Sequence, residues 1–155
     1  MIAAITLYAV IKFIHIFAAI VAVGFNASYG IWLARAARDP QHELHVLRGI
    51  KILDDRWANP AYGVLLVTGV INVFVGDWSF QTFWIAASLA LFVILGLMGF
   101  FLYTPTLRRQ IEVIQAEGRD SPSYQALSNR GRMLGIIMAV LVTVIIFLMV
   151  TKPTL

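Results

Sequence analysis

The sequence contains no cysteine, and only 13% of its 155 residues are charged. The lack of cysteine excludes a disulfide framework, a thiolate metal site and a thiol nucleophile. An ordinary soluble domain has about 25% charged residues, so this chain has too little polar surface to cover a soluble core. Hydrophobic residues make up 60% of the chain, which indicates a small membrane bundle instead.

Motifs for several kinds of chemistry are also missing. The sequence has no phosphate-binding loop, no catalytic triad pattern and no zinc motif. Its net charge of +4 is modest, and the basic residues lie in connections beside apolar segments, where such residues face anionic lipid headgroups. We therefore expect membrane lipids as partners and no nucleic acid. Whether the protein is an enzyme stays open.

Four apolar segments are long enough to cross a bilayer, which takes about 20 residues of helix. They are residues 5–33, 57–75, 78–107 and 133–151. We expect one membrane domain over residues 1–155, an all-α four-helix bundle with antiparallel, up-and-down topology. Apolar residues at helical spacing extend the second and third helices beyond the membrane. Gly76-Asp77 predicts a tight turn that makes the second and third segments a hairpin, and Pro60 predicts a kink.

Lysine and arginine are distributed unequally among the connections. Ten of the twelve lie between the first and second segments or between the third and fourth, and the other two are Lys12 and Lys152. By the positive-inside rule, the two longer connections are cytoplasmic and both termini lie outside. The sequence thus predicts a multi-pass protein of a bacterial inner membrane, with helices extended on the cytoplasmic side.

Polar and small residues form one stripe along the first segment. At spacings of three and four they share a helix face: Tyr8, Lys12, His15, Ala19, Ala22 and Asn26. Polar side chains are costly in hydrocarbon and usually face the bundle interior or a cavity. His15 lies roughly 15 Å from the outer end of its helix, and Thr68, Ser88 and Thr143 offer hydroxyl groups at similar depth.

The imidazole of His15 can ligate haem iron or carry protons. Alternatively, it is a neutral group bonded across the bundle as polar glue. No second histidine lies at matching depth, so a haem here has one protein ligand or shares a site between subunits. Tyr8, Lys12 and Asn26 are further candidate cofactor-binding residues. Lys12 can steer an anionic propionate, or its ammonium group can reach the outer interface.

Short motifs in this chain resemble those of a family of small four-helix membrane proteins. They occur in the family's order: Lys12-Phe-Ile-His15, then Asp55-Arg56 to Pro60, then Thr68-Gly69, then Met149-Val-Thr-Lys-Pro153. The family includes the HemJ-type protoporphyrinogen oxidases, the CopD-like copper-resistance membrane domain and a set of predicted integral membrane proteins (DUF2269). The DUF2269 set is the most similar to this chain.

The resemblance to HemJ-type proteins implies a b-type haem with His15 as the iron ligand, and oxidation of a porphyrinogen in the membrane. Those proteins carry a histidine-alanine-lysine segment early in the third span, where this chain reads Trp84-Ile-Ala-Ala-Ser88. The difference argues against porphyrinogen oxidation but not against haem binding. We therefore expect a haem-binding redox protein. The alternatives are a non-catalytic subunit or scaffold, partnered by other membrane subunits or by its own copies, and a small-solute transporter.

Overall fold

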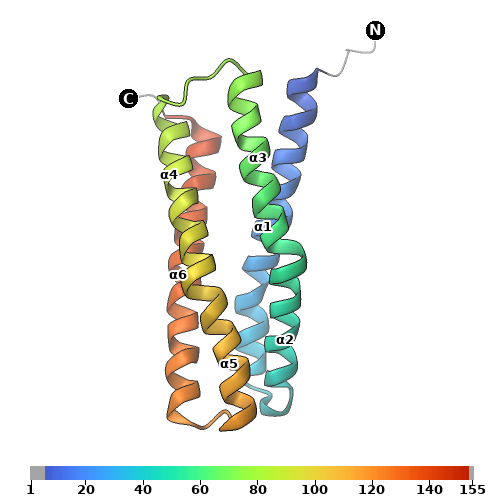
Figure 1. Ribbon diagram of the computed structural model, residues 1–155, viewed down its shortest axis with the longest axis vertical. Helices are drawn as coiled ribbons and strands as arrows, with labels where there is room; N and C mark the ends of the chain where they lie inside the picture. The colour runs from blue at the N-terminus through green and yellow to red at the C-terminus, as the bar shows by residue number, and fades with distance from the viewer. Residues whose placement is uncertain (1–5, 154–155) are drawn as a thin grey trace.

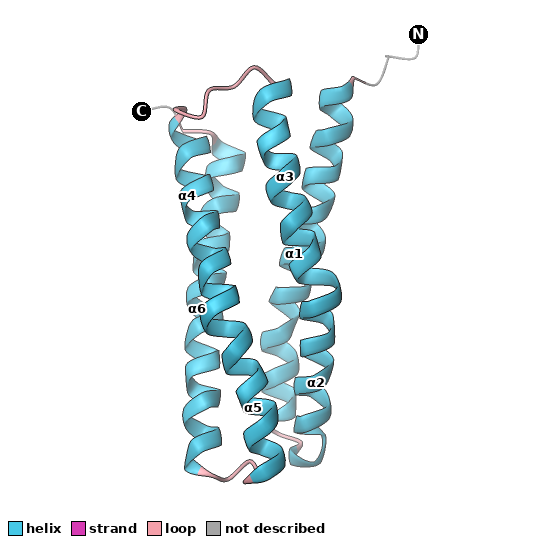
Figure 2. Cartoon of the chain, viewed as in Figure 1, coloured by secondary structure: helices cyan, strands magenta, loops and turns pink. Residues whose placement is uncertain are grey.

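The computed structural model describes residues 6–153, which form helices joined by short connections, with no strand among them (Figure 2). Four continuous helical stretches are long and apolar enough to cross a membrane: Leu7–Ala36, Pro40–Val75, Phe83–Ala116 and Pro122–Thr151. The expectation of an all-α protein with four spans is therefore confirmed. Residue 5, where the first predicted span begins, lies outside the described residues.

The first and last stretches are single helices, α1 (Leu7–Ala36) and α6 (Pro122–Thr151). The two middle stretches each change helix type along their length. The second stretch runs through a short turn of 3-10 helix (Pro40–His42), α2 (Glu43–Leu53), a π-helical segment (Asp54–Ala58) and α3 (Asn59–Val75). The third runs through α4 (Phe83–Met98), a π-helical segment (Gly99–Tyr103) and α5 (Thr104–Ala116).

Each π-helical segment stands immediately before a proline-containing turn, because Pro60 and Pro105 are the second residues of α3 and α5. Proline has no N–H group to donate to the carbonyl four residues earlier. The N–H of Asn59 donates to the carbonyl of Asp54, five residues back, and an equivalent bond precedes Pro105. The irregularity expected at Pro60 is therefore a widened π-helical turn.

The four stretches run alternately up and down the bundle (Figure 1). Helix α1 begins and α6 ends at the same end, which also holds the connection between α3 and α4. The other two connections lie at the opposite end, together with ten of the twelve Lys and Arg residues. We call this opposite end the cationic end and the first one the open end. The side of the membrane that each end faces stays a prediction.

The helices pack in two pairs, α1 with α3 and α4 with α6. Figure 1 shows the two pairs standing apart towards the open end. Gly76 and Asp77 do form a turn, which ends α3. The prediction that this turn alone joins the two spans as a hairpin is wrong, because residues 76–82 form a longer connection and the next helix begins at Phe83 rather than at Trp78. The second and third spans are antiparallel, but each packs on a different partner, since the longer connection lets them separate.

At the cationic end the two pairs meet in a continuous core. It joins α1, α2, α5 and α6 through Tyr29, Leu47, Ile50, Tyr103, Leu107, Tyr124 and Leu134. A smaller cluster connects the pairs near the open end through Val73, Trp84, Ile85 and Leu148. The bundle is therefore closed most firmly at the end where its cations lie.

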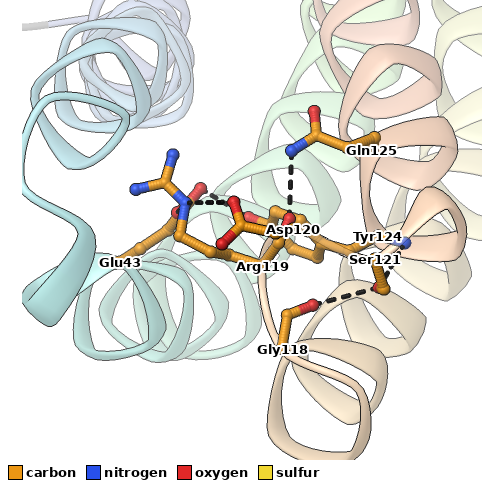
Figure 3. A network of polar contacts seen from close by, with 7 residues as sticks. All are labelled: Glu43, Gly118, Arg119, Asp120, Ser121, Tyr124 and Gln125. Atoms are coloured by element: carbon orange, nitrogen blue, oxygen red, sulfur yellow. Dashed lines mark hydrogen bonds and ion pairs between the residues drawn. The ribbon is translucent and has the colours of Figure 1, made fainter.

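A polar network fastens the cationic end (Figure 3). The hydroxyl of Tyr124 donates to Oε1 of Glu43 at 2.6 Å, and Nε of Arg119 lies 3.4 Å from the other carboxylate oxygen. This network ties the start of α2 to the start of α6.

Candidate functional site

A cavity of about 530 Å³ lies between the two helix pairs, on the open-end side of the main core. Its walls come from α1, α3, α4 and α6, and most of the lining side chains are apolar. Small-molecule and cofactor sites are typically mostly apolar cavities of about 300–1,000 Å³ with a few placed polar groups. The polar or charged lining residues are Tyr8, Lys12, His15, Tyr62, Asn72, Ser88 and Lys152.

His15 is held in the cavity wall by one of its two ring nitrogens. Its Nδ1 lies 3.0 Å from the carbonyl oxygen of Leu65 and 3.1 Å from the hydroxyl oxygen of Thr68. The carbonyl can only accept, so we assign the proton to Nδ1. Nε2 then carries a lone pair, and no described residue donates a hydrogen bond to it.

Gly69 lets the imidazole lie directly against α3. A Cβ atom at this position would approach Cε1 of His15 to 3.0 Å and Nδ1 to 3.5 Å. Thr68 is locked beside it, since its hydroxyl donates to the carbonyl of Val64 at 2.6 Å. We call the Thr68-Gly69 pair the seat of His15, because Thr68 forms a hydrogen bond with the imidazole and Gly69 leaves space for it.

Of the three hydroxyls expected at the depth of His15, two are at the site. Thr68 bonds to the imidazole, and Ser88 of α4 lines the cavity. Thr143 is exposed on α6 and donates to the carbonyl of Ala139. Its side chain therefore does not take part in the site.

Two lysines line the same cavity from opposite helix pairs. Lys12 of α1 is exposed, and its Nζ lies 5.6 Å from the ring centroid of Tyr8. Lys152 follows α6, and its Nζ lies 5.0 Å from the ring centroid of Trp78 and 5.2 Å from that of Trp84. The other ten Lys and Arg residues lie towards the cationic end, so Lys12 and Lys152 give the cavity positive charge at the open end.

The sequence reasoning did not assign Lys152 or Asn72 to the site. The sequence does contain a signal for Lys152, because Lys152 and Lys12 are separated from the other ten cations. The Oδ1 atom of Asn72 and the hydroxyl of Ser88 are buried without a hydrogen-bond partner among the described residues, and Ser88 is only 1% exposed. Buried polar groups nearly always have a partner, and both of these residues belong to the lining of the cavity.

The structure separates Asn26 from the other candidate residues. Tyr8, Lys12 and His15 all line the cavity, whereas Asn26 does not, and its side-chain amide donates to the carbonyl of Ala22 at 2.9 Å. Asn26 is thus satisfied within its own helix, although it shares the predicted stripe.

A metal centre built from protein ligands alone does not fit this site. Within residues 6–153, no three His, Asp or Glu side chains come together in a way that can hold a metal ion. Haem needs fewer protein ligands because its macrocycle supplies four nitrogens, and one histidine is enough. The single free imidazole nitrogen is therefore compatible with haem.

Four helices that are long and apolar enough to cross a membrane are typical of a polytopic integral membrane protein. The family model of predicted integral membrane proteins (DUF2269) matches residues 9–153. The chain therefore belongs to the DUF2269 family. No curated protein and no solved structure matches it.

Proposed function

We propose that the cavity binds a b-type haem, which Nε2 of His15 would hold through its iron, and that the protein is a membrane redox protein. One observation supports this most: His15 borders an apolar cavity of about 530 Å³ while its Nδ1 is occupied by the Leu65 carbonyl. Histidines that ligate metals nearly always donate their other ring N–H in this way, which fixes the tautomer and the ring orientation.

The remaining lining residues suit the same ligand. The apolar walls match a macrocycle, and the two lysines at the open end match a pair of anionic propionates. Ser88 and Asn72 offer hydrogen-bonding groups that the protein itself does not satisfy. When bound, the haem would supply one-electron redox chemistry.

The residues of the chain would bind and orient such a group. The Leu65 carbonyl and Gly69 fix the imidazole, Lys12 and Lys152 balance negative charge, and the apolar walls keep water away from the centre. Porphyrinogen oxidation is not part of the proposal, because Trp84-Ile-Ala-Ala-Ser88 offers neither the histidine nor the lysine that the HemJ-type segment has.

The test is an absorption spectrum of the protein purified in detergent after expression with ample haem supply. We expect a Soret band that disappears in His15→Ala. His45→Ala removes an exposed histidine at the cationic end and is the matched control, which should keep the band. Size-exclusion chromatography shows whether each variant is folded.

A colourless, monodisperse wild-type protein that also takes up no added haemin would refute the proposal. The alternatives would then be tested in turn. Co-purification of other membrane proteins with both wild type and His15→Ala would support a subunit or scaffold, and His15-dependent flux in liposomes would support a transporter.

A further inference from the structure

A second hollow, of about 460 Å³, lies where α4 passes through its π-helical segment into α5. It is lined by Phe100, Phe101, Thr104, Pro105, Arg108, Arg109 and Glu112. None of these residues lines the cavity beside His15. The hollow is therefore separate from the cavity proposed to bind haem.

Along the helix, the side chains that line the hollow change from aromatic to cationic to acidic. Phe100 and Phe101 come first, and they are 72% and 64% exposed within a stretch that has no charged residue from 78 to 107. Their rings meet nearly edge-on, with centroids 5.0 Å apart. Exposed aromatic side chains in an uncharged span suit contact with acyl chains.

Arg108 and Arg109 follow immediately after the uncharged stretch, roughly 10 Å further along the helix axis at 1.5 Å per residue. Both are exposed, and neither forms an ion pair in the part of the chain that the structure describes. Guanidinium groups bind phosphate oxygens through paired N–H donors. Two of them at the end of an apolar span mark the height at which lipid phosphates lie.

Glu112 completes the order one turn further from the apolar part. It stands four residues after Arg108, so the two share a helix face, about 6 Å apart along the axis. Glu112 is exposed and also forms no ion pair within the described residues. A carboxylate at this place attracts a cationic group that lies beyond the phosphate.

We propose that this hollow binds one molecule of a phospholipid with an ammonium headgroup, namely phosphatidylethanolamine. The order of the lining residues matches the order of groups along that lipid. Phe100 and Phe101 contact an acyl chain, Arg108 and Arg109 bind the phosphate, and Glu112 binds the ammonium group. Phosphatidylglycerol matches the first two positions, but it has no cation for the third, so Glu112 selects against it.

The experiment is a native mass spectrometry titration of the full-length protein in detergent. Phosphatidylethanolamine and phosphatidylglycerol with identical acyl chains are added separately, and the fraction of protein that carries one lipid is measured. We expect the wild type to prefer phosphatidylethanolamine by about fivefold, and the double variant Arg108→Gln, Arg109→Gln to retain it about tenfold less. The double variant Arg35→Gln, Arg38→Gln removes the same charge from exposed residues at the same end and should bind as the wild type does.

Glu112→Gln separates a headgroup site from general attraction between cations and lipids. We expect it to bring the preference for phosphatidylethanolamine close to one, while binding of phosphatidylglycerol is kept or increased. An equal or greater preference of the wild type for phosphatidylglycerol would overturn the assignment. So would equal losses in the two arginine double variants, because binding would then follow total charge.

Discussion

The Nδ1 atom of His15 lies 3.0 Å from the carbonyl oxygen of Leu65, a bond that joins α1 to α3 across 50 residues of sequence. It places an ionisable side chain from one helix in the groove of another and leaves Nε2 without a protein partner. The contact that bonds His15 across the bundle thus also fixes the orientation of its Nε2. The two interpretations of His15 left open by the sequence are compatible.

Gly69→Ala tests the seat of the imidazole. The added Cβ would lie 3.0 Å from Cε1 of His15, closer than most side chains approach, so the ring must move by a few tenths of an ångström, which strains its bond to Leu65. We expect haem retention to fall several-fold and the Soret band to move or broaden. Gly63→Ala lies in the same helix with nothing within 4 Å of its new Cβ. Gly63→Ala is therefore the control and should keep the spectrum of the wild type. If Gly69→Ala keeps it as well, Gly69 does not set the orientation of His15.

The location of this seat was partly predictable from the sequence. The three-four spacing brings Tyr8, Lys12 and His15 to one face, because a helix repeats every 3.6 residues. The pairing of α1 with α3 was not predictable, since apolar faces gain no hydrophobic energy from each other in lipid and packing detail decides between partners. Asn26 shows the limit of the pattern, because a carbonyl of its own helix satisfies it.

Lys152 escaped prediction for a related reason. Near the end of the chain it resembles an ordinary interfacial charge, and only the packing of α4 on α6 brings it over Trp78 and Trp84 and beside the cavity. The hairpin expected at Gly76-Asp77 was wrong because helix packing, which the sequence does not reveal, again decides the outcome. The local sequence suits a turn, but residues 76–82 span the distance between two separate helix pairs.

Ser88→Ala tests whether the cavity is built for a polar ligand. The hydroxyl is buried and unpartnered in the protein alone, so we expect the variant without ligand to be as stable as the wild type or slightly more stable. A lost hydrogen bond to the ligand should weaken binding about two- to tenfold. Haemin titration followed by absorbance measures this. Thr143→Val removes an exposed, self-bonded hydroxyl and should bind like the wild type; equal affinities for all three proteins would exclude a role for Ser88.

The two lysines of the cavity should recognise negative charge on the ligand. Exposed ion pairs contribute about 0.2–1 kcal/mol, so we expect Lys12→Gln and Lys152→Gln each to weaken haemin binding by up to about fivefold. Haemin dimethyl ester carries no carboxylates and supplies the control, since the wild type and both variants should bind it alike. A similar loss with the ester would mean that the lysines act on protein structure rather than on propionates.

Tyr124 and Tyr29 allow a paired test of the core at the cationic end. Both are 3% exposed and belong to the same cluster, but Tyr124 donates to Glu43 whereas the Tyr29 hydroxyl has no partner among the described residues. Tyr124→Phe leaves a buried carboxylate short of a donor, which should cost about 1–3 kcal/mol. Tyr29→Phe removes an unsatisfied hydroxyl and should be neutral or stabilising. Unfolding in mixed micelles, followed by circular dichroism, compares them, and equal losses would contradict this account.

The absence of cysteine makes the orientation of the chain directly measurable. Asp120→Cys places a thiol in the connection between α5 and α6, and Gln81→Cys places one in the connection between α3 and α4; both residues are exposed. Ten cations at the end that holds Asp120 predict that this end is cytoplasmic, since basic connections are retained there. In intact spheroplasts, a membrane-impermeant maleimide should label the Gln81→Cys protein at once and the Asp120→Cys protein only after lysis. The reverse pattern would place the two lysines that line the cavity on the cytoplasmic side.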